Sequence, residues 1–260
     1  MPSLVPPTRA QDFAEEALPT PRWIADKLLP GDGWTLLVAR PKTGKSLLAL
    51  RLAACVQGAK PFLGRTIAEP GGVLYIQVDA PPGDWQGQVR LLGPGEREWD
   101  TYTRQHLPMY CLDPTNAVFQ GQLRDRIAKA GYRLVILDAL EKLTKEDINT
   151  KEGCQKFIER LRFVSPGPTL VIHHPRKPHG DNADNVIDSA AGHHYLTGDA
   201  SAVWGLTKND GGGVLKVQTR GTEDQSISLH RLPSGLWELA PAKPKPQPLV
   251  NAAPVQWGKL

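Results

Sequence analysis

The sequence is poor in cysteine and has no long hydrophobic run. Its 260 residues contain three cysteines, Cys55, Cys111 and Cys154, which are far apart and form no C-x-x-C pair. This argues against a disulfide framework and against a cysteine-based zinc site. No stretch approaches the roughly 18 apolar residues of a membrane-spanning helix, and the first residues lack the apolar centre of a secretory signal. We therefore expect a cytoplasmic protein that is not held in a membrane.

Neither sign of charge dominates the chain. Lysine and arginine number 31 and aspartate and glutamate 27, which gives a net charge of +4. This small basic excess is compatible with nucleic-acid binding but does not indicate it alone. A hydrophobic content of 40% and a charged content of 22% are ordinary for a globular protein with a sizeable core.

Proline marks both ends of the sequence. Five of the 24 prolines lie in residues 1–22 and five in residues 241–260. Proline lacks the N–H group that helices and sheets require, so such segments favour extended, solvated chain. We predict a Pro-rich arm over residues 1–22 with one short helix near residues 11–18, a folded domain over residues 23–240, and a Pro- and Lys-rich flexible tail over residues 241–260.

Apolar runs alternate with helical patterns in the first two thirds of the domain. Strands are predicted at residues 34–38, 73–78, 132–137 and 169–173, with a weaker candidate at 107–112. Helices are predicted at residues 46–56, 84–92, 122–130 and 150–164. This alternation is typical of an α/β fold with a mostly parallel central sheet flanked by helices.

The pattern changes after about residue 198. Four strand-like segments follow one another at residues 200–207, 214–219, 226–231 and 236–239. Glycine, asparagine and proline, which favour turns, separate them. We expect a C-terminal antiparallel meander that extends the same sheet.

The clearest motif is Ala-Arg-Pro-Lys-Thr-Gly-Lys-Ser at residues 39–46, between a predicted strand and a predicted helix. Backbone N–H groups of such a turn, and of the helix that follows, form a site for phosphate. Lys45 can reach the β- and γ-phosphates, and the Ser46 hydroxyl can bind Mg²⁺. Ala39 replaces the usual first glycine, which is tolerated if its φ is negative. The candidate nucleotide-binding residues are Arg40, Pro41, Lys42, Thr43, Gly44, Lys45, Ser46 and Leu47.

A second candidate is Asp138, which ends the apolar run at residues 134–137. In proteins with a phosphate loop, a carboxylate at this place holds Mg²⁺, usually through water. The alternative is a strand-end aspartate that only caps the next turn. We predict ATP and Mg²⁺ as cofactors, with Ser46 and Asp138 as the metal ligands.

Residues 20–240 resemble the RecA-like ATPases of the RepA type, AAA-type enzymes whose best-known members are hexameric replicative helicases. Besides the phosphate loop, the resemblance is carried by the turn at residues 60–65, the strands at 73–79, 134–138 and 214–220, and the pair His173-His174 followed by Lys177. It implies a RecA-like P-loop fold and ATP hydrolysis.

The resemblance also implies roles for single residues. Asp79 takes the place of the catalytic carboxylate, usually a longer glutamate, with Glu141 as an alternative. His174 matches the polar sensor of the γ-phosphate. Arg220 matches an arginine finger that enters the neighbouring subunit's site, although Gln218 stands where some relatives have lysine.

A zinc site is the competing interpretation of the histidines. The candidate ligands are His173, His174, His179, His193 and His194. Adjacent residues of a strand point to opposite faces of the sheet, which disfavours one shared metal.

The partners implied by the resemblance are single-stranded DNA and further copies of the chain, with a hexameric ring as one candidate. The loop at residues 175–191 would face the DNA, and the tail could recruit a replication partner. The basic and acidic residues of the loop offset each other: Arg176, Lys177, His179, Asp181, Asp184 and Asp188. The alternative is a nucleotide-gated DNA-binding, regulatory or loader protein with little or no hydrolysis.

Overall fold

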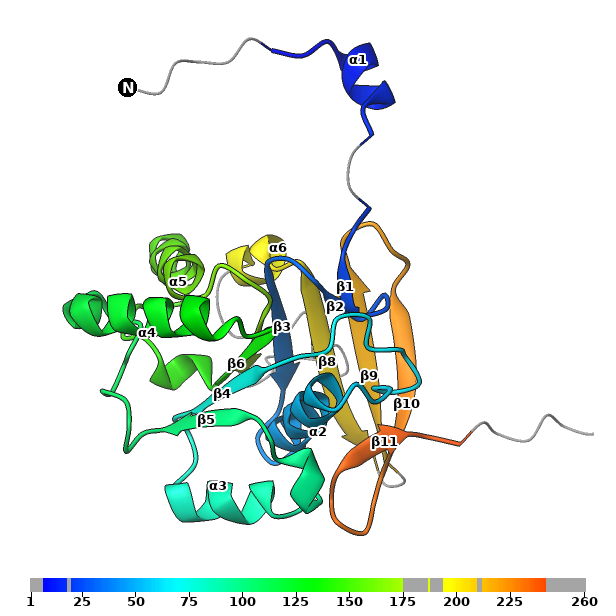
Figure 1. Ribbon diagram of the computed structural model, residues 1–260, viewed down its shortest axis with the longest axis vertical. Helices are drawn as coiled ribbons and strands as arrows, with labels where there is room; N and C mark the ends of the chain where they lie inside the picture. The colour runs from blue at the N-terminus through cyan, green and yellow to red at the C-terminus, as the bar shows by residue number, and fades with distance from the viewer. Residues whose placement is uncertain (1–6, 18–19, 175–186, 188–193, 210–211, 242–260) are drawn as a thin grey trace, which may run out of the picture.

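A sheet of nine strands forms the centre of the molecule, in the order β11-β10-β9-β8-β3-β7-β6-β4-β5 (Figure 1). The computed structural model describes residues 7–17, 20–174, 187, 194–209 and 212–241. Arm residues 1–6 and 18–19, most of the loop at 175–191, and tail residues 242–260 lie outside the described part.

Six neighbouring strands, from β8 to β5 in this spatial order, are parallel to one another. They are β3 (Trp34–Ala39), β4 (Val73–Gln77), β5 (Asp100–Thr103), β6 (Leu134–Asp138), β7 (Thr169–His173) and β8 (Ala202–Asn209). Every residue of β3, β4, β6 and β7 is buried. Burial on both faces explains why these strands appear in the sequence as continuous apolar runs. The predicted α/β class is confirmed.

The remaining strands form the predicted antiparallel meander on the same sheet. They are β9 (Gly212–Thr219), β10 (Gln225–Arg231) and β11 (Trp237–Leu239). Because β9 reverses the direction of β8 and β10 reverses it again, β10 runs in the same direction as β3. The end of β10 therefore lies at the same edge of the sheet as the end of β3.

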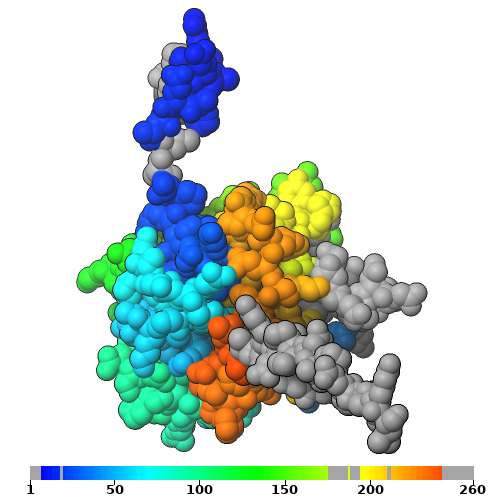
Figure 2. All heavy atoms as spheres, turned by 90° about the vertical axis from the view of Figure 1, so that its right-hand side faces the viewer, coloured from blue at the N-terminus to red at the C-terminus, as the bar shows by residue number. Residues whose placement is uncertain are grey.

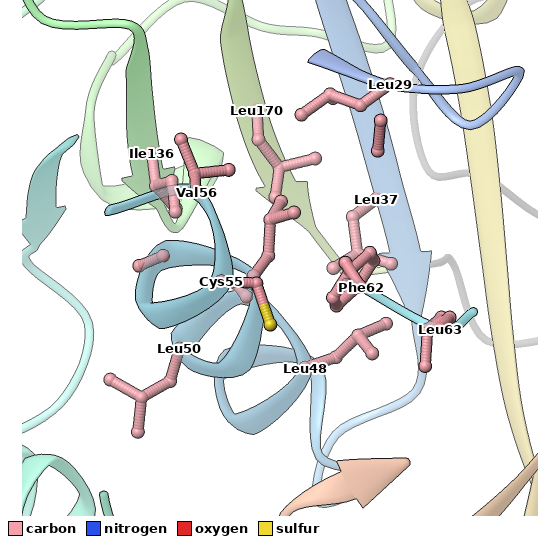
Figure 3. Packing of buried hydrophobic residues seen from close by; sticks show 14 of the residues in the cluster. Leu29, Leu37, Leu48, Leu50, Cys55, Val56, Phe62, Leu63, Ile136 and Leu170 are labelled. Atoms are coloured by element: carbon pink, nitrogen blue, oxygen red, sulfur yellow. The ribbon is translucent and has the colours of Figure 1, made fainter. Parts of the chain in front are cut away.

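Helices cover both faces of the sheet (Figure 1). On one face, α2 (Lys45–Gln57) packs against Leu37, Ile136 and Leu170 (Figure 3). On the other face lie α4 (Ala117–Ala130) and α5 (Lys151–Val164). The buried residues of α5 include the expected Cys154, Phe157, Ile158 and Leu161.

The short elements are α1 (Ala10–Glu15), α3 (Pro82–Val89), α6 (Tyr195–Asp199) and the pair β1 (Trp23–Ala25) with β2 (Leu29–Pro30). The arm helix α1 buries none of its residues and stands away from the sheet (Figures 1 and 2). In the described part of the chain, no helix is both long and apolar enough to span a bilayer.

The predicted strand at residues 107–112 is wrong. This segment forms turns, and the sheet instead takes the polar segment of β5, which pairs only with β4 at the edge. Leu107, Cys111 and Leu112 are buried under the α4 side, which explains the apolar run. Pro108 interrupts that run, and proline cannot donate to a sheet ladder.

Candidate nucleotide-binding site

The phosphate loop joins the end of β3 to the start of α2. Ala39 has a negative φ at the end of β3, so its methyl group is tolerated, whereas Lys42 and Gly44 are left-handed with φ of 62° and 102°. A Cβ atom at Gly44 would lie 2.7 Å from Nε1 of Trp237, so only glycine fits. The hydroxyl of Thr43 donates to the Arg40 carbonyl at 2.7 Å, which closes the turn.

Lys45, the first residue of α2, is buried with its ammonium group inside the loop. Its Nζ donates to the Arg40 carbonyl at 3.3 Å and lies 3.0 Å from Nδ1 of His174. An ammonium has only donors, so Nδ1 of His174 accepts this hydrogen bond. Burial lowers the pKa of Lys45, and neighbouring carboxylates, above all Asp138, oppose this effect.

Asp138 is buried at the end of β6, beside the start of α2. Its Oδ2 accepts hydrogen bonds from Tyr75 Oη at 2.9 Å and from Gln77 Nε2 at 2.8 Å. Burial raises the pKa of Asp138, and hydrogen bonds with Ser46 and Tyr75 act against it. A hydroxyl and a carboxylate brought together in this way are the hard oxygen donors that Mg²⁺ prefers. Ser46 and Asp138 therefore fit the ion.

Gln77, at the end of β4, connects the two aspartates of the site. Its Nε2 donates to Asp138, while its Oε1 accepts from the backbone N–H of Asp79 at 2.7 Å and of Ala80 at 2.9 Å. The amide thus fixes the backbone that carries Asp79. Sequence reasoning missed Gln77, although a polar residue inside an apolar, fully buried strand was a signal that it has buried partners.

Asp79 lies just beyond β4 and is close to His174. Nε2 of His174 is 3.8 Å from Oδ2 of Asp79. The interaction with His174 holds the pKa of Asp79 below its usual value, against the effect of burial. His174 therefore bridges Lys45 and Asp79, with one ring nitrogen toward each.

Glu141, the alternative carboxylate, is engaged elsewhere. Its Oε1 accepts from the backbone N–H of His174 at 2.7 Å and lies 2.7 Å from Nδ1 of His173. Burial acts to raise the pKa of Glu141, but His173 and the His174 backbone hold it below its usual value. Glu141 therefore stabilises the end of β7. It does not line the cavity that Asp79 lines.

The phosphate loop and the side chains that converge on it surround one cavity of about 380 Å³. Its size lies in the range of small-molecule sites. The loop backbone, Lys45, Asp79, Asp138 and His174 all face it. The full lining is Pro41, Lys42, Gly44, Lys45, Ser46, Leu47, Asp79, Gln88, Asp138, His174 and Arg231. The predicted Arg40 and Thr43 are not in the lining and contribute by closing the turn.

Arg220 is not near this cavity. In the sheet, Thr219 pairs with Ala202, and Ala202 pairs with Thr35 near the start of β3. Arg220, the next residue, therefore lies level with the start of β3 rather than with its end. The six residues of β3 make five steps between the two edges, about 17 Å at about 3.3 Å per step. The Arg220 guanidinium donates to the carbonyls of Gly198 and, at 3.2 Å, Asp199. A role for Arg220 at a nucleotide thus needs a second subunit and stays a prediction.

The loop predicted to contact DNA falls almost wholly outside the described residues. This applies to Arg176, Lys177, His179, Asp181, Asp184 and Asp188, and also to the zinc candidate His193. Among the described residues, no three His, Cys, Asp or Glu side chains are placed to hold one metal ion.

A protein-family model matches the part of the chain that carries the candidate site. Residues 2–180 match the model of a protein family described as an AAA domain. The match covers more than half of the chain and includes the phosphate loop, Asp79, Asp138 and His174, while the antiparallel strands lie beyond it. A comparison with curated proteins gives no match.

Proposed function

Because this chain belongs to the AAA domain family of P-loop ATPases, we propose that it binds MgATP in the 380 Å³ cavity and hydrolyses it. The observation that carries the proposal is the convergence of Lys45, Asp79 and Asp138 on one cavity at the phosphate loop. Members of this family generally bind nucleotide with Mg²⁺.

Each side chain has a chemical role in this proposal. Lys45 and the loop N–H groups bind the phosphate oxygens, and Ser46 with Asp138 would hold Mg²⁺, which supplies charge neutralisation at the β- and γ-phosphates. Asp79 orients the attacking water and accepts its proton, a contribution of about 10²- to 10⁴-fold. His174 contacts both Lys45 and Asp79, so a γ-phosphate that draws Lys45 away also alters the partner of Asp79.

Nucleotide binding is tested by isothermal titration of the full chain with MgATP. Lys45→Ala removes the buried cation, and Lys129→Ala removes an exposed lysine of α4 as the matched control. We expect Lys45→Ala to weaken binding at least tenfold, since hydrogen bonds to charged groups contribute about 1.5–3 kcal/mol. A wild-type chain that does not bind MgATP, or equal affinity in the two variants, would contradict the proposal.

We further propose that the ATPase forms a homo-oligomeric ring and acts on single-stranded DNA. The resemblance to RepA-type helicases supports both ideas. In a head-to-tail ring, different surfaces of neighbouring subunits meet, and Arg220 lies at the sheet edge opposite to its own cavity, as a group acting on a neighbour would. Stimulation of ATP turnover by single-stranded DNA is the expected result, and turnover that DNA leaves unchanged contradicts the DNA proposal.

One observation favours the second candidate, a nucleotide-gated regulatory or loader protein with little hydrolysis. Asp79 is one methylene shorter than the usual glutamate, and His174 holds its pKa below the usual value, which makes it a weaker base. A purified chain that binds MgATP tightly but releases no phosphate, with or without DNA, would favour this function.

A further inference from the structure

The C-terminal hairpin brings an arginine to the phosphate loop from outside the family match at residues 2–180. Arg231 ends β10 and pairs in the sheet with Trp237, the first residue of β11. Nε1 of Trp237 donates to the Gly44 carbonyl at 3.1 Å, so the hairpin is tied to the loop. The Arg231 guanidinium carbon lies 5.1 Å from the centre of a Trp237 ring. The indole therefore serves as a platform that holds the guanidinium.

The guanidinium lies against the loop backbone and faces the cavity. A Cβ atom at Gly44 would lie 3.0 Å from Nη2 of Arg231. Arg231 lines the cavity together with Lys45 and Asp138. Within the described part of the chain, no carboxylate forms an ion pair with Arg231.

The charges of the cavity show what this arginine adds. Without Arg231, two lysines, Lys42 and Lys45, face two aspartates, Asp79 and Asp138. The fixed charges then balance, although the proposed ligand is strongly anionic. Arg231 makes the lining net positive. A guanidinium also offers several N–H donors in a plane that matches phosphate oxygens.

We infer that Arg231 binds the phosphate chain of the nucleotide held by its own subunit, with Trp237 positioning the guanidinium. This inference rests on the proposed binding of MgATP. It assigns to the antiparallel strands a direct part in the nucleotide site, whereas Arg220 on the same meander points to the opposite edge of the sheet.

The test compares charge with side-chain bulk at position 231. Arg231→Met keeps the length of the stem and removes the charge, while Arg231→Lys keeps the charge. Arg104→Ala, at an exposed arginine beyond β5, is the control for loss of one positive charge. Titration of each full chain with MgATP gives the affinity, and the thermal midpoint without nucleotide reports the fold. If Arg231→Met does not fold, Arg231→Gln replaces it.

We expect Arg231→Met to weaken MgATP binding roughly tenfold or more and Arg104→Ala to bind like wild type. Arg231→Lys should lose less affinity than Arg231→Met, because it keeps the charge but not the planar donors. Equal affinity in Arg231→Met and wild type, or equal loss in Arg231→Met and Arg231→Lys, overturns the inference. Either of those results leaves MgATP binding itself intact. A wild-type chain that does not bind MgATP removes the proposed function and the inference together.

Discussion

Gln77 has no proposed chemical role at the site, yet it is hydrogen-bonded at both candidate carboxylates. A single amide donates to Asp138 and accepts from the backbone of Asp79 and Ala80. A buried donor or acceptor that loses its partner costs about 1–3 kcal/mol. The position of both carboxylates therefore depends on one side chain that carries no charge.

Gln77→Leu is expected to lower the free energy of unfolding by about 2–3 kcal/mol, because three hydrogen bonds are lost and two N–H groups stay unpaired. It also frees the Asp79 backbone, so ATP turnover should fall more than MgATP affinity. The measurements are urea unfolding and steady-state phosphate release. The same change at Gln57, whose Oε1 is buried without a hydrogen-bond partner among the described residues, should cost less, and equal losses at both positions would contradict this account.

The order and type of the main elements could be predicted because buried parallel strands leave continuous apolar runs in the sequence. The phosphate loop and Asp138 could be found because each follows directly from such a run. The strand β5 could not, since an edge strand with polar residues such as Asp100 and Thr101 has no hydrophobic signature. The part proposed for Arg231 depends on the contact between the C-terminal hairpin and the phosphate loop, which a residue pattern alone does not give.

At the scale of elements, one indole N–H ties the C-terminal hairpin to the phosphate loop. Trp237→Phe removes the bond to the Gly44 carbonyl, and Trp204→Phe removes a similar bond to the Leu28 carbonyl at 3.0 Å, where neither residue lines the cavity. Both tryptophans are fully buried. Each change should cost about 1 kcal/mol of unfolding free energy.

Only Trp237→Phe is expected to weaken MgATP binding, by about threefold to tenfold, because only this change loosens the platform beneath Arg231. Titration with MgATP and urea unfolding of both variants separate the two effects. Loss of affinity in both variants would mean that the hairpin affects the site through general stability alone, and loss in neither would contradict the role of Trp237 in holding Arg231.

For the whole molecule, the groups proposed to take part in one reaction lie at opposite edges of the sheet. The cavity lies at the carboxyl edge of the parallel strands, and Arg220 lies at the amino edge. Within one subunit the two edges of the sheet stay apart. In a ring with head-to-tail contacts, by contrast, different surfaces of neighbouring subunits meet. The proposal that Arg220 acts on a neighbour is therefore a proposal about assembly, and it is best tested with mixed subunits.

A Lys45→Ala subunit keeps Arg220 but has a disabled nucleotide cavity. An Arg220→Ala subunit keeps an intact cavity but lacks the arginine that would act on its neighbour. Each variant alone should show little ATP turnover. In an equal mixture that exchanges subunits, about a quarter of the head-to-tail contacts join an intact cavity to an intact Arg220. Turnover should then recover to about that fraction of wild type, while light scattering during gel filtration with MgATP reports the assembly. Mixed oligomers without recovered turnover would contradict the role of Arg220, and a monomer under these conditions would contradict the ring.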